Sequence, residues 1–251
     1  MKAVVIAAGL GSRLKPYTNN LPKSLVPING ISILECQFNV YRSLKVKNIN
    51  VIVGYKKEKF KFRNINYFTN KDYKKNNILE SLFFAKSKLR GNCIISYSDI
   101  LFKRSVVKKL IKSKDAISIV VDENWKKAYK GRTMHPVSQA ENVLFNKSNF
   151  LLKAGKNLSA NKSNAEFIGM IKLNSRGCEL FKKYYKIAKK LFKNKKFYNA
   201  KNIQKAYLTD FFNFLIEREI KIRCIKIKNN WMEIDTVQDY KRAQNFFKWW
   251  I

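Results

Sequence analysis

Short apolar runs alternate with amphipathic stretches along the first half of the chain, and this rhythm constrains the fold more than any other feature. Four of the runs have the length of a buried strand: 3–8, 49–54, 93–97 and 116–121. Between them, the stretches 31–45 and 76–89 space their apolar residues at helical intervals. A chain that alternates strands and helices in this way is typical of an open α/β sheet. The sequence therefore predicts a mainly parallel central sheet flanked by helices.

The second half of the chain, after about residue 122, has a less regular pattern. A strand is expected at 165–173, two lysine-rich amphipathic helices within 176–219, and a further strand at 220–228. The last residues predict a terminal helix rich in phenylalanine and tryptophan. No linker rich in Pro, Gly or Ser and no internal repeat separates the two halves. We therefore expect one domain over 1–251, with both halves in a single mixed sheet.

The chain carries a formal net charge of +35, from 52 Lys and Arg residues against 17 Asp and Glu. Such a charge could serve a nucleic-acid surface, because basic side chains that neutralise phosphates supply most non-specific affinity. Here the lysines are scattered, no basic arm stands apart, and no module of interleaved basic and aromatic residues is visible. The pattern favours a solvated basic surface, which would also attract polyanionic substrates such as nucleotides.

Composition also bounds the setting in which the protein works. Hydrophobic residues make up 46% of the chain, enough for a sizeable core, and no apolar run approaches the ~20 residues of a membrane helix. The N-terminus runs at once into glycines and charges, so it is not expected to be a signal peptide. The cysteines lie too far apart for a zinc or redox motif: Cys36, Cys93, Cys178 and Cys224. We expect a cytoplasmic location and no membrane partner.

The segment AAGLGSRLKPYTNNLPKSL ends the first predicted strand and continues beyond it. Ligands of an open parallel sheet lie beyond the carboxyl ends of its strands, so this segment is expected at the ligand edge. Gly9 and Gly11 let backbone N–H groups approach phosphate oxygens without a Cβ in the way. Arg13 and Lys23 add cations that can reach the same phosphates. The dinucleotide fingerprint needs a glycine where Leu14 stands, and the Walker motif does not fit either.

The pattern G-x-G-x-R-L-x-P-x-T, followed by P-K-S-L, resembles the signature of the nucleotidyltransferases that make sugar nucleotides and related activated compounds. The resemblance implies a Rossmann-like, glycosyltransferase-A-like α/β fold, with a nucleotide-binding half at about 1–121 and an acceptor-binding half at about 122–251. It implies that Arg13 and Lys23 are catalytic and bind the triphosphate and the transferring phosphorus. It also implies a nucleotide-binding loop: Ala7, Ala8, Gly9, Leu10, Gly11 and Ser12.

Two aspartates stand in contexts that resemble the metal-binding motifs of this family, SD-x-x-F and W-x-EIDT-x-x-D. Asp99, in SDILF, follows a buried strand, and Asp235, in WMEIDTVQD, precedes the terminal helix. Because nucleotidyl transfer joins two anions, Mg²⁺ held by carboxylates and substrate phosphates is expected. The attacking oxygen is already ionised near neutral pH, so the only histidine, His135, is not needed as a general base. It either contacts substrate or orders its loop, and Glu233 either supports the metal or pairs with a lysine.

The segment NNILESLFFAK resembles the N-N-x-x-x-S-L segment of phosphocholine and aminoethylphosphonate cytidylyltransferases. The resemblance implies that Asn76, Asn77 and Ser81 bind the nucleotide, although either asparagine equally fits a helix cap. The remainder of the chain is similar to the acceptor half of these enzymes. A small phosphonate requires cations, and an amine at its other end requires carboxylates or aromatic faces. The candidate acceptor-binding residues are Asp122, Arg132, His135, Lys153, Lys156, Glu166 and Asp210.

Three hypotheses of function follow. The first is a Mg²⁺-dependent cytidylyltransferase that transfers CMP from CTP to a phosphocholine-like or aminoethylphosphonate-like small molecule and releases pyrophosphate. The second is a nucleotidylyltransferase that makes an NDP-sugar, whose acceptor would require many neutral hydrogen-bonding groups. The third is a non-catalytic, basic nucleic-acid-binding protein, which the intact signature residues disfavour. The sequence does not decide the acceptor or rank CTP firmly over UTP, and the resemblance allows a homodimer.

Overall fold

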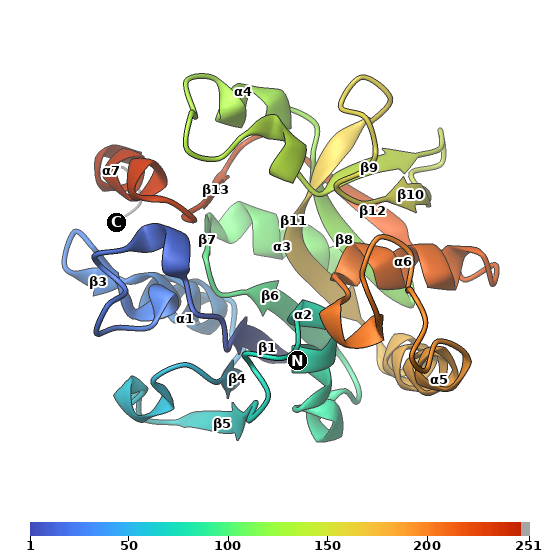
Figure 1. Cartoon of the computed structure of the whole chain (residues 1–251), viewed down its shortest axis with the longest axis horizontal. Coiled ribbons are helices and arrows are strands. Elements are labelled where there is room, and N and C mark those ends of the chain that lie inside the picture. The colour runs from blue at the N-terminus through green and yellow to red at the C-terminus, as the bar shows by residue number, and fades with distance from the viewer. Residues whose placement is uncertain (247–251) are drawn as a thin grey trace.

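The computed structural model describes residues 1–246 and builds them around one nine-stranded sheet (Figure 1). The strands of this sheet are β1 (Lys2–Ala7), β4 (Asn48–Val53), β5 (Ile65–Thr69), β6 (Cys93–Tyr97), β8 (Ile117–Asp122), β9 (Asn142–Phe145), β10 (Leu151–Ala154), β11 (Ala165–Leu173) and β12 (Arg223–Ile227). Two small sheets pair β2 (Pro27–Ile28) with β3 (Ile31–Ser32) and β7 (Ile100–Phe102) with β13 (Trp231–Glu233). Every strand predicted from the sequence is present, with ends shifted by a few residues at most.

The sheet is mixed, and its order explains where a ligand can bind. The strands run β10-β9-β11-β6-β1-β4-β5, with β8 beside β11 and β12 beside β8. β1 pairs in parallel with β4 and β6, whereas β11 pairs antiparallel with β6 and β8. Both halves of the chain therefore contribute strands to one sheet, as predicted. The carboxyl ends of β1, β4 and β6 meet at one edge, which is where parallel sheets bind ligands.

Helices cover both faces of the sheet (Figure 1). They are α1 (Ile33–Ser43), α2 (Ile78–Phe83), α3 (Arg104–Lys112), α4 (Trp125–Tyr129), α5 (Ser175–Leu191), α6 (Leu208–Ile216) and α7 (Val237–Phe246). The two helices predicted within 176–219 are α5 and α6, but only α5 is lysine-rich, because the sequence of α6 contains no lysine. The predicted terminal helix is α7, but its Trp249 and Trp250 lie outside the described residues. Along residues 1–246, no helix combines the length and the apolar character needed to cross a membrane.

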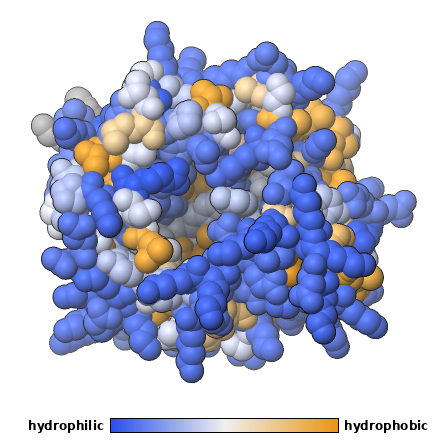
Figure 2. Space-filling view, viewed as in Figure 1, coloured by the Kyte–Doolittle hydropathy of each residue, from blue (hydrophilic) through white to orange (hydrophobic). Residues whose placement is uncertain are grey.

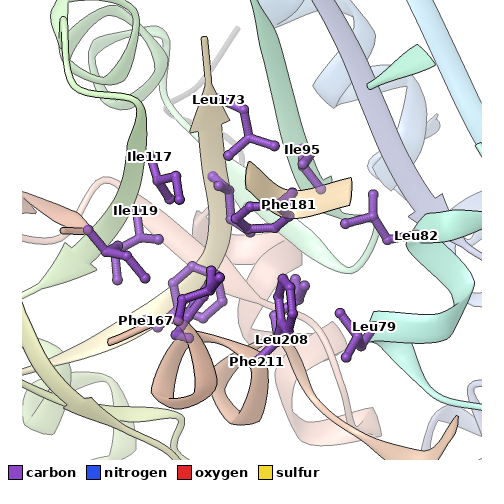
Figure 3. Close-up of a cluster of buried hydrophobic side chains, with 14 of the residues drawn as sticks. Leu79, Leu82, Ile95, Ile117, Ile119, Phe167, Leu173, Phe181, Leu208 and Phe211 are labelled. Atoms are coloured by element: carbon purple, nitrogen blue, oxygen red, sulfur yellow. The ribbon is translucent and has the colours of Figure 1, made fainter. Parts of the chain in front are cut away.

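Alternating side chains of β1 join two separate hydrophobic clusters. Val4 and Ile6 pack toward α2, α5 and α6, and Ala3 and Val5 pack toward α1 and α3. Figure 3 shows the first cluster, where Phe181 of α5 lies close to side chains of β11 and α6. Each fully buried large apolar side chain contributes about 1.5–3 kcal/mol. Burial on both faces therefore fixes β1, and with it the start of the loop at the ligand edge.

Candidate active site

The loop that follows β1 turns at Gly11. This residue has a φ of +62°, in the left-handed region that favours glycine, and a Cβ added to it would lie 2.7 Å from the Cβ of Lys23. The Gly11 carbonyl accepts hydrogen bonds from the Thr18 hydroxyl at 2.9 Å and from the Leu14 N–H at 3.0 Å. The glycine is therefore required for both its conformation and its lack of a side chain. The close approach that it allows brings Lys23 beside the start of the loop.

A cleft of about 350 Å³ opens at this edge of the sheet. Figure 2 shows the corresponding face hollowed near its centre, with hydrophilic side chains around the hollow. The cleft is lined by all of the predicted nucleotide-binding residues: Ala7, Ala8, Gly9, Leu10, Gly11, Ser12, Asn76, Asn77 and Ser81. Arg13, Lys23, Asp99 and Asp235 line the same cleft. Segments far apart in the sequence are thus assembled around one cavity.

Lys23 joins the two predicted metal ligands. Its Nζ donates to Asp99 Oδ2 at 2.6 Å and to Asp235 Oδ1 at 2.9 Å. Burial alone would lower the pKa of Lys23, but the two carboxylates raise it above its ordinary value. The lysine therefore stays charged, and the two carboxylates are close enough to share one cation.

The acidic pair has donor atoms that suit a divalent metal. Burial alone would raise the pKa of Asp235, but Lys23, a hydrogen bond with His135 and the charge of Arg13 hold it well below its ordinary value. Arg13 also forms an ion pair with Asp235. Asp99 Oδ1 is buried and has no hydrogen-bond partner within residues 1–246. Carboxylate oxygens, one of them unpartnered, are the ligands that Mg²⁺ takes in proteins, so these residues fit the expected ion.

Arg132 and His135 contact acidic residues next to the cleft. Arg132 donates to Asp239 Oδ1 at 2.6 Å and to Glu233 Oε2 at 2.9 Å. His135 Nδ1 lies 3.1 Å from Asp235 Oδ2 and 3.6 Å from Glu233 Oε2. The ligand atoms of His135, Glu233 and Asp235 lie within 4.8 Å of one another, so this group could hold a second cation. Glu233 pairs with an arginine rather than with a lysine, and the Arg132 guanidinium is engaged by the carboxylates of Glu233 and Asp239.

A smaller cavity of about 40 Å³ adjoins the cleft and is lined by buried acids. Burial raises the pKa of Glu141 to about 7. Burial and the nearby charge of Glu233 raise the pKa of Glu166 to about 8. Lys156 lines both the cleft and this cavity, with its Nζ 4.5 Å from the centre of the Tyr207 ring. Of the predicted acceptor-binding residues, the structure thus brings together Lys156, His135 and Glu166.

Three other predicted acceptor-binding residues do not line the cleft. Lys153 is exposed on β10, and its strand position turns it toward solvent. Asp210 caps α6, because its oxygens accept the N–H groups of Tyr207 at 2.9 Å and Asn199 at 3.1 Å. Asp122 is buried at the end of β8 and accepts the Trp231 indole N–H at 2.7 Å. For Asp210 and Asp122, the hydrogen bonds are structural ones that the sequence pattern did not separate from ligand contacts.

The asparagines before α2 show that one residue can serve two purposes. Asn77 caps the helix by accepting the Ile78 N–H at 2.8 Å, as the cap alternative predicted, and it also lines the cleft. The Asn70 side-chain amide donates two hydrogen bonds from its Nδ2, to Asn76 Oδ1 at 2.9 Å and to Ser81 Oγ at 2.8 Å. Asn70 thereby orients two cleft residues without lining the cleft itself.

Several cleft residues were not identified as site residues from the sequence. Tyr97 is the last residue of β6, and Ser98 lies between it and Asp99. Tyr207 directly precedes α6. Tyr97 could have been predicted from the sequence, because the last residue of a buried strand lies at the same sheet edge as the aspartate that follows it. Tyr207 enters the cleft only through the packing of α6, for which no local pattern exists.

The fold and the site together define a nucleotidyltransferase. A glycine loop, the two basic side chains of Arg13 and Lys23, and an acidic pair meet at the carboxyl edge of a mixed sheet. The chain belongs to the family of MobA-like NTP transferase domains, whose family model matches residues 3–168. This family membership confirms the class that the signature residues predicted.

Two relatives and one solved structure illustrate the similarity. The CTP:phosphoglutamine cytidylyltransferase of Campylobacter jejuni is 30% identical over 251 residues, covering 95% of this chain and 97% of that protein. The choline-phosphate cytidylyltransferase of Streptococcus pneumoniae is 36% identical over 117 residues, covering 45% of this chain and 51% of that protein. The inositol-1-phosphate CTP transferase from T. maritima shares the fold, with a TM-score of 0.73 at 18% identity over 100% of this chain and 97% of that one. The predicted fold class is therefore confirmed.

Proposed function

We propose that the protein is a Mg²⁺-dependent cytidylyltransferase that transfers CMP from CTP to a small phosphorylated or phosphonate acceptor and releases pyrophosphate. One observation carries the proposal: the Lys23 ammonium lies between Asp99 and Asp235 beside the Gly9–Gly11 loop. The two similar cytidylyltransferases support CTP as the donor. Phosphoglutamine, phosphocholine and aminoethylphosphonate are the acceptors to test first.

The reaction forms a bond between an acceptor oxygen and the α-phosphorus of CTP. The bond from that phosphorus to the β-phosphate oxygen breaks, and pyrophosphate leaves with the electron pair. Both reactants are anions, so cations must offset their charge and hold them in line. Lys23 uses two of its three N–H groups on the carboxylates, which leaves the third for a phosphate oxygen. Arg13, with a half-exposed side chain, lies at the mouth of the cleft and faces the leaving pyrophosphate in this proposal.

Asp99 and Asp235 would hold the Mg²⁺ ion. When bound, the ion would neutralise phosphate charge and help to orient the phosphate chain. The glycine loop would contribute backbone N–H groups to the same phosphates, because nothing lies within 4 Å of a Cβ position on Gly9. No side chain is required to remove a proton from the acceptor, whose attacking oxygen is already ionised near neutral pH.

The two halves of the chain divide the substrates in this proposal. The half at 1–121 binds the nucleotide through the loop and through Asn76 and Ser81. The half at 122–251 binds the acceptor near Lys156. All four cysteines are free, which supports the cytoplasmic location expected from the sequence. A homodimer stays a prediction.

The acceptor side of the site disfavours a sugar-1-phosphate. Such an acceptor requires neutral hydrogen-bonding groups for its hydroxyls, whereas Glu141, Glu166 and Glu233 line the small cavity. A nucleic-acid-binding role would leave the assembled acidic pair without a purpose, because carboxylates repel a phosphate backbone.

The test is a pyrophosphate-release screen with Mg²⁺, in which each of the four NTPs is combined with phosphoglutamine, phosphocholine, aminoethylphosphonate and sugar-1-phosphates. We expect release with CTP and an acceptor of the first three kinds. Preference for UTP with a sugar-1-phosphate would replace the proposal by the second hypothesis. If no combination releases pyrophosphate and the protein binds labelled oligonucleotides at physiological salt, the nucleic-acid hypothesis would replace it.

A further inference from the structure

A second cavity, of about 270 Å³, lies between α4, β13 and α7. These elements lie next to one another in Figure 1, on the side of the cleft away from α5. The second cavity shares Glu166, Trp231 and Glu233 with the small cavity that adjoins the cleft. An acceptor with its phosphate in the cleft could therefore reach the second cavity with its far end.

Glu166 has one carboxylate oxygen that the protein leaves unsatisfied. The residue is 4% exposed, and its Oε1 accepts the Tyr129 hydroxyl at 2.5 Å. Its Oε2 is buried and has no hydrogen-bond partner among residues 1–246. Leaving a buried acceptor unpaired costs about 1–3 kcal/mol, and more for a charged group. Because Glu166 lines both cavities, a ligand bound there is the group that can supply the missing donor.

A donor that also brings positive charge would favour the ionised form of Glu166, which burial and the nearby acids Glu233 and Glu141 oppose. Arg132, whose charge acts on Glu166, already donates to Glu233 and Asp239. An ammonium group with N–H bonds would satisfy both the hydrogen bond and the charge. A quaternary ammonium has no N–H bond and would satisfy only the charge.

The other side of the second cavity carries cations. Lys127 and Arg242 both line it. Within the described part of the chain, neither of them forms an ion pair, and Arg242 makes one hydrogen bond, to the Ala128 carbonyl at 3.3 Å. These two side chains are therefore available to an anion. An α-amino acid, whose ammonium and carboxylate are bonded to the same carbon, offers a partner to Glu166 and a partner to these two cations.

We propose that the second cavity binds the α-amino-acid end of the acceptor, with Glu166 accepting from the ammonium and Lys127 and Arg242 facing the carboxylate. This inference rests on the proposed function, because it names the class of acceptor for that reaction. An amino-acid-derived acceptor is also what the name of the Campylobacter jejuni relative describes. Specificity then comes from a subsite separate from the phosphate-binding loop.

The first test compares two acceptors in the pyrophosphate-release assay. They are phosphoglutamine and its analogue with hydrogen in place of the α-amino group. We expect the wild type to have a KM at least tenfold lower for phosphoglutamine. The variant Glu166→Gln keeps the side-chain volume and the Tyr129 hydrogen bond but cannot become ionised, so it should treat the two acceptors alike within about threefold. Equal preference by the wild type, or an unchanged preference in Glu166→Gln, would overturn the inference while leaving the cytidylyltransferase proposal intact.

A matched lysine pair tests the carboxylate side of the cavity. Lys127→Ala should raise the KM for phosphoglutamine severalfold with little change in kcat. Lys126→Ala is the control, because the neighbouring Lys126 is exposed, lies by the Trp125 ring and does not line the cavity. If both variants behave alike, Lys127 has no role in binding the acceptor.

Direct binding separates the inference from the proposed function. Calorimetric titration with L-glutamine, which carries no phosphate, should show binding to the wild type and at least tenfold weaker binding to Glu166→Gln. This result without any pyrophosphate release would keep the subsite and refute the cytidylyltransferase. Equal affinity of both proteins for L-glutamine, or no binding to the wild type, would overturn the subsite.

Discussion

Replacing Lys23 by alanine is the most demanding test of the site, because its ammonium has both a structural and a catalytic role in the proposal. In the folded protein it neutralises Asp99 and Asp235, and in the reaction it meets a phosphate oxygen. Loss of one contact to transition-state charge typically lowers kcat by about 10²–10³. We therefore expect Lys23→Ala to lower the rate of CTP-dependent pyrophosphate release by that factor.

The same variant should lose stability in a way that depends on metal. Breaking a buried ion pair typically costs about 3–5 kcal/mol. We expect about 2 kcal/mol here, because Asp235 keeps Arg13 and His135, and the side chain of Asp99 is 21% exposed. For a chain of this size that corresponds to a fall in Tm of roughly 4–8 °C. A divalent ion that takes the position between the carboxylates should restore a large part of the lost stability, since a ligand at a hundred times its Kd adds about 2.7 kcal/mol to the free energy of unfolding.

The measurement is a pair of thermal melts, with EDTA and with saturating Mg²⁺, alongside the kinetic assay. Lys15→Ala is the matched control, because Lys15 lies in the same loop, is exposed and does not line the cleft. Turnover of Lys23→Ala within threefold of the wild type would refute the assignment of Lys23. An equal rise in Tm on adding Mg²⁺ to Lys23→Ala and to Lys15→Ala would refute the assignment of the acidic pair.

Three further predictions concern the loop, the metal and the buried acids. Gly11→Ala should lower the Tm by several degrees, because its Cβ would lie 2.7 Å from Lys23, whereas Gly9→Ala should melt like the wild type; equal melting of the two variants would contradict the close approach. Asp99→Asn should raise the Mg²⁺ concentration needed for half-maximal activity about tenfold, the scale typical of perturbed metal sites, and EDTA should abolish activity in the wild type; an unchanged Mg²⁺ titration would remove Asp99 from the site. The pKa of Glu141 is raised from 4.5 to about 7 on folding, so its favourable contribution is complete below pH 4.5 and is lost as the pH rises through 7. Glu141→Gln should thus match the wild type in Tm at pH 5 and exceed it at pH 8.5, by up to about 3 kcal/mol of unfolding free energy; a constant difference across this range would show that Glu141 titrates normally.

Local patterns were sufficient for the elements that define the fold. The apolar runs at β1, β4 and β6 are buried on both faces, and such strands can be recognised without knowing their partners. The strands β9 and β10 were missed because they are short and only partly apolar. Their place at the sheet edge is decided by pairing, of β9 with β11 and of β10 with β9, rather than by their own composition.

The acceptor side shows where sequence reasoning ends. Arg132 was expected to bind a phosphonate, but it pairs with Glu233 and Asp239, which lie about a hundred positions further along the chain. Asp210 was expected to bind an amine, but it caps α6. A charged side chain has the same one-letter code whether it meets a ligand, a cap or another charge. Only the packing of distant segments selects among these partners.

The sequence by itself determined the central strands of the sheet, the glycine loop with its two cations, and each of the two aspartates in its own motif, because each of these depends on residues that are close along the chain. The tertiary structure decided that Lys23 joins the two aspartates, that Glu166 keeps a free oxygen, and that a second cavity lies beyond it. These features arise between segments separated by many residues, and their geometry depends on which side chains the packed core turns toward the cleft.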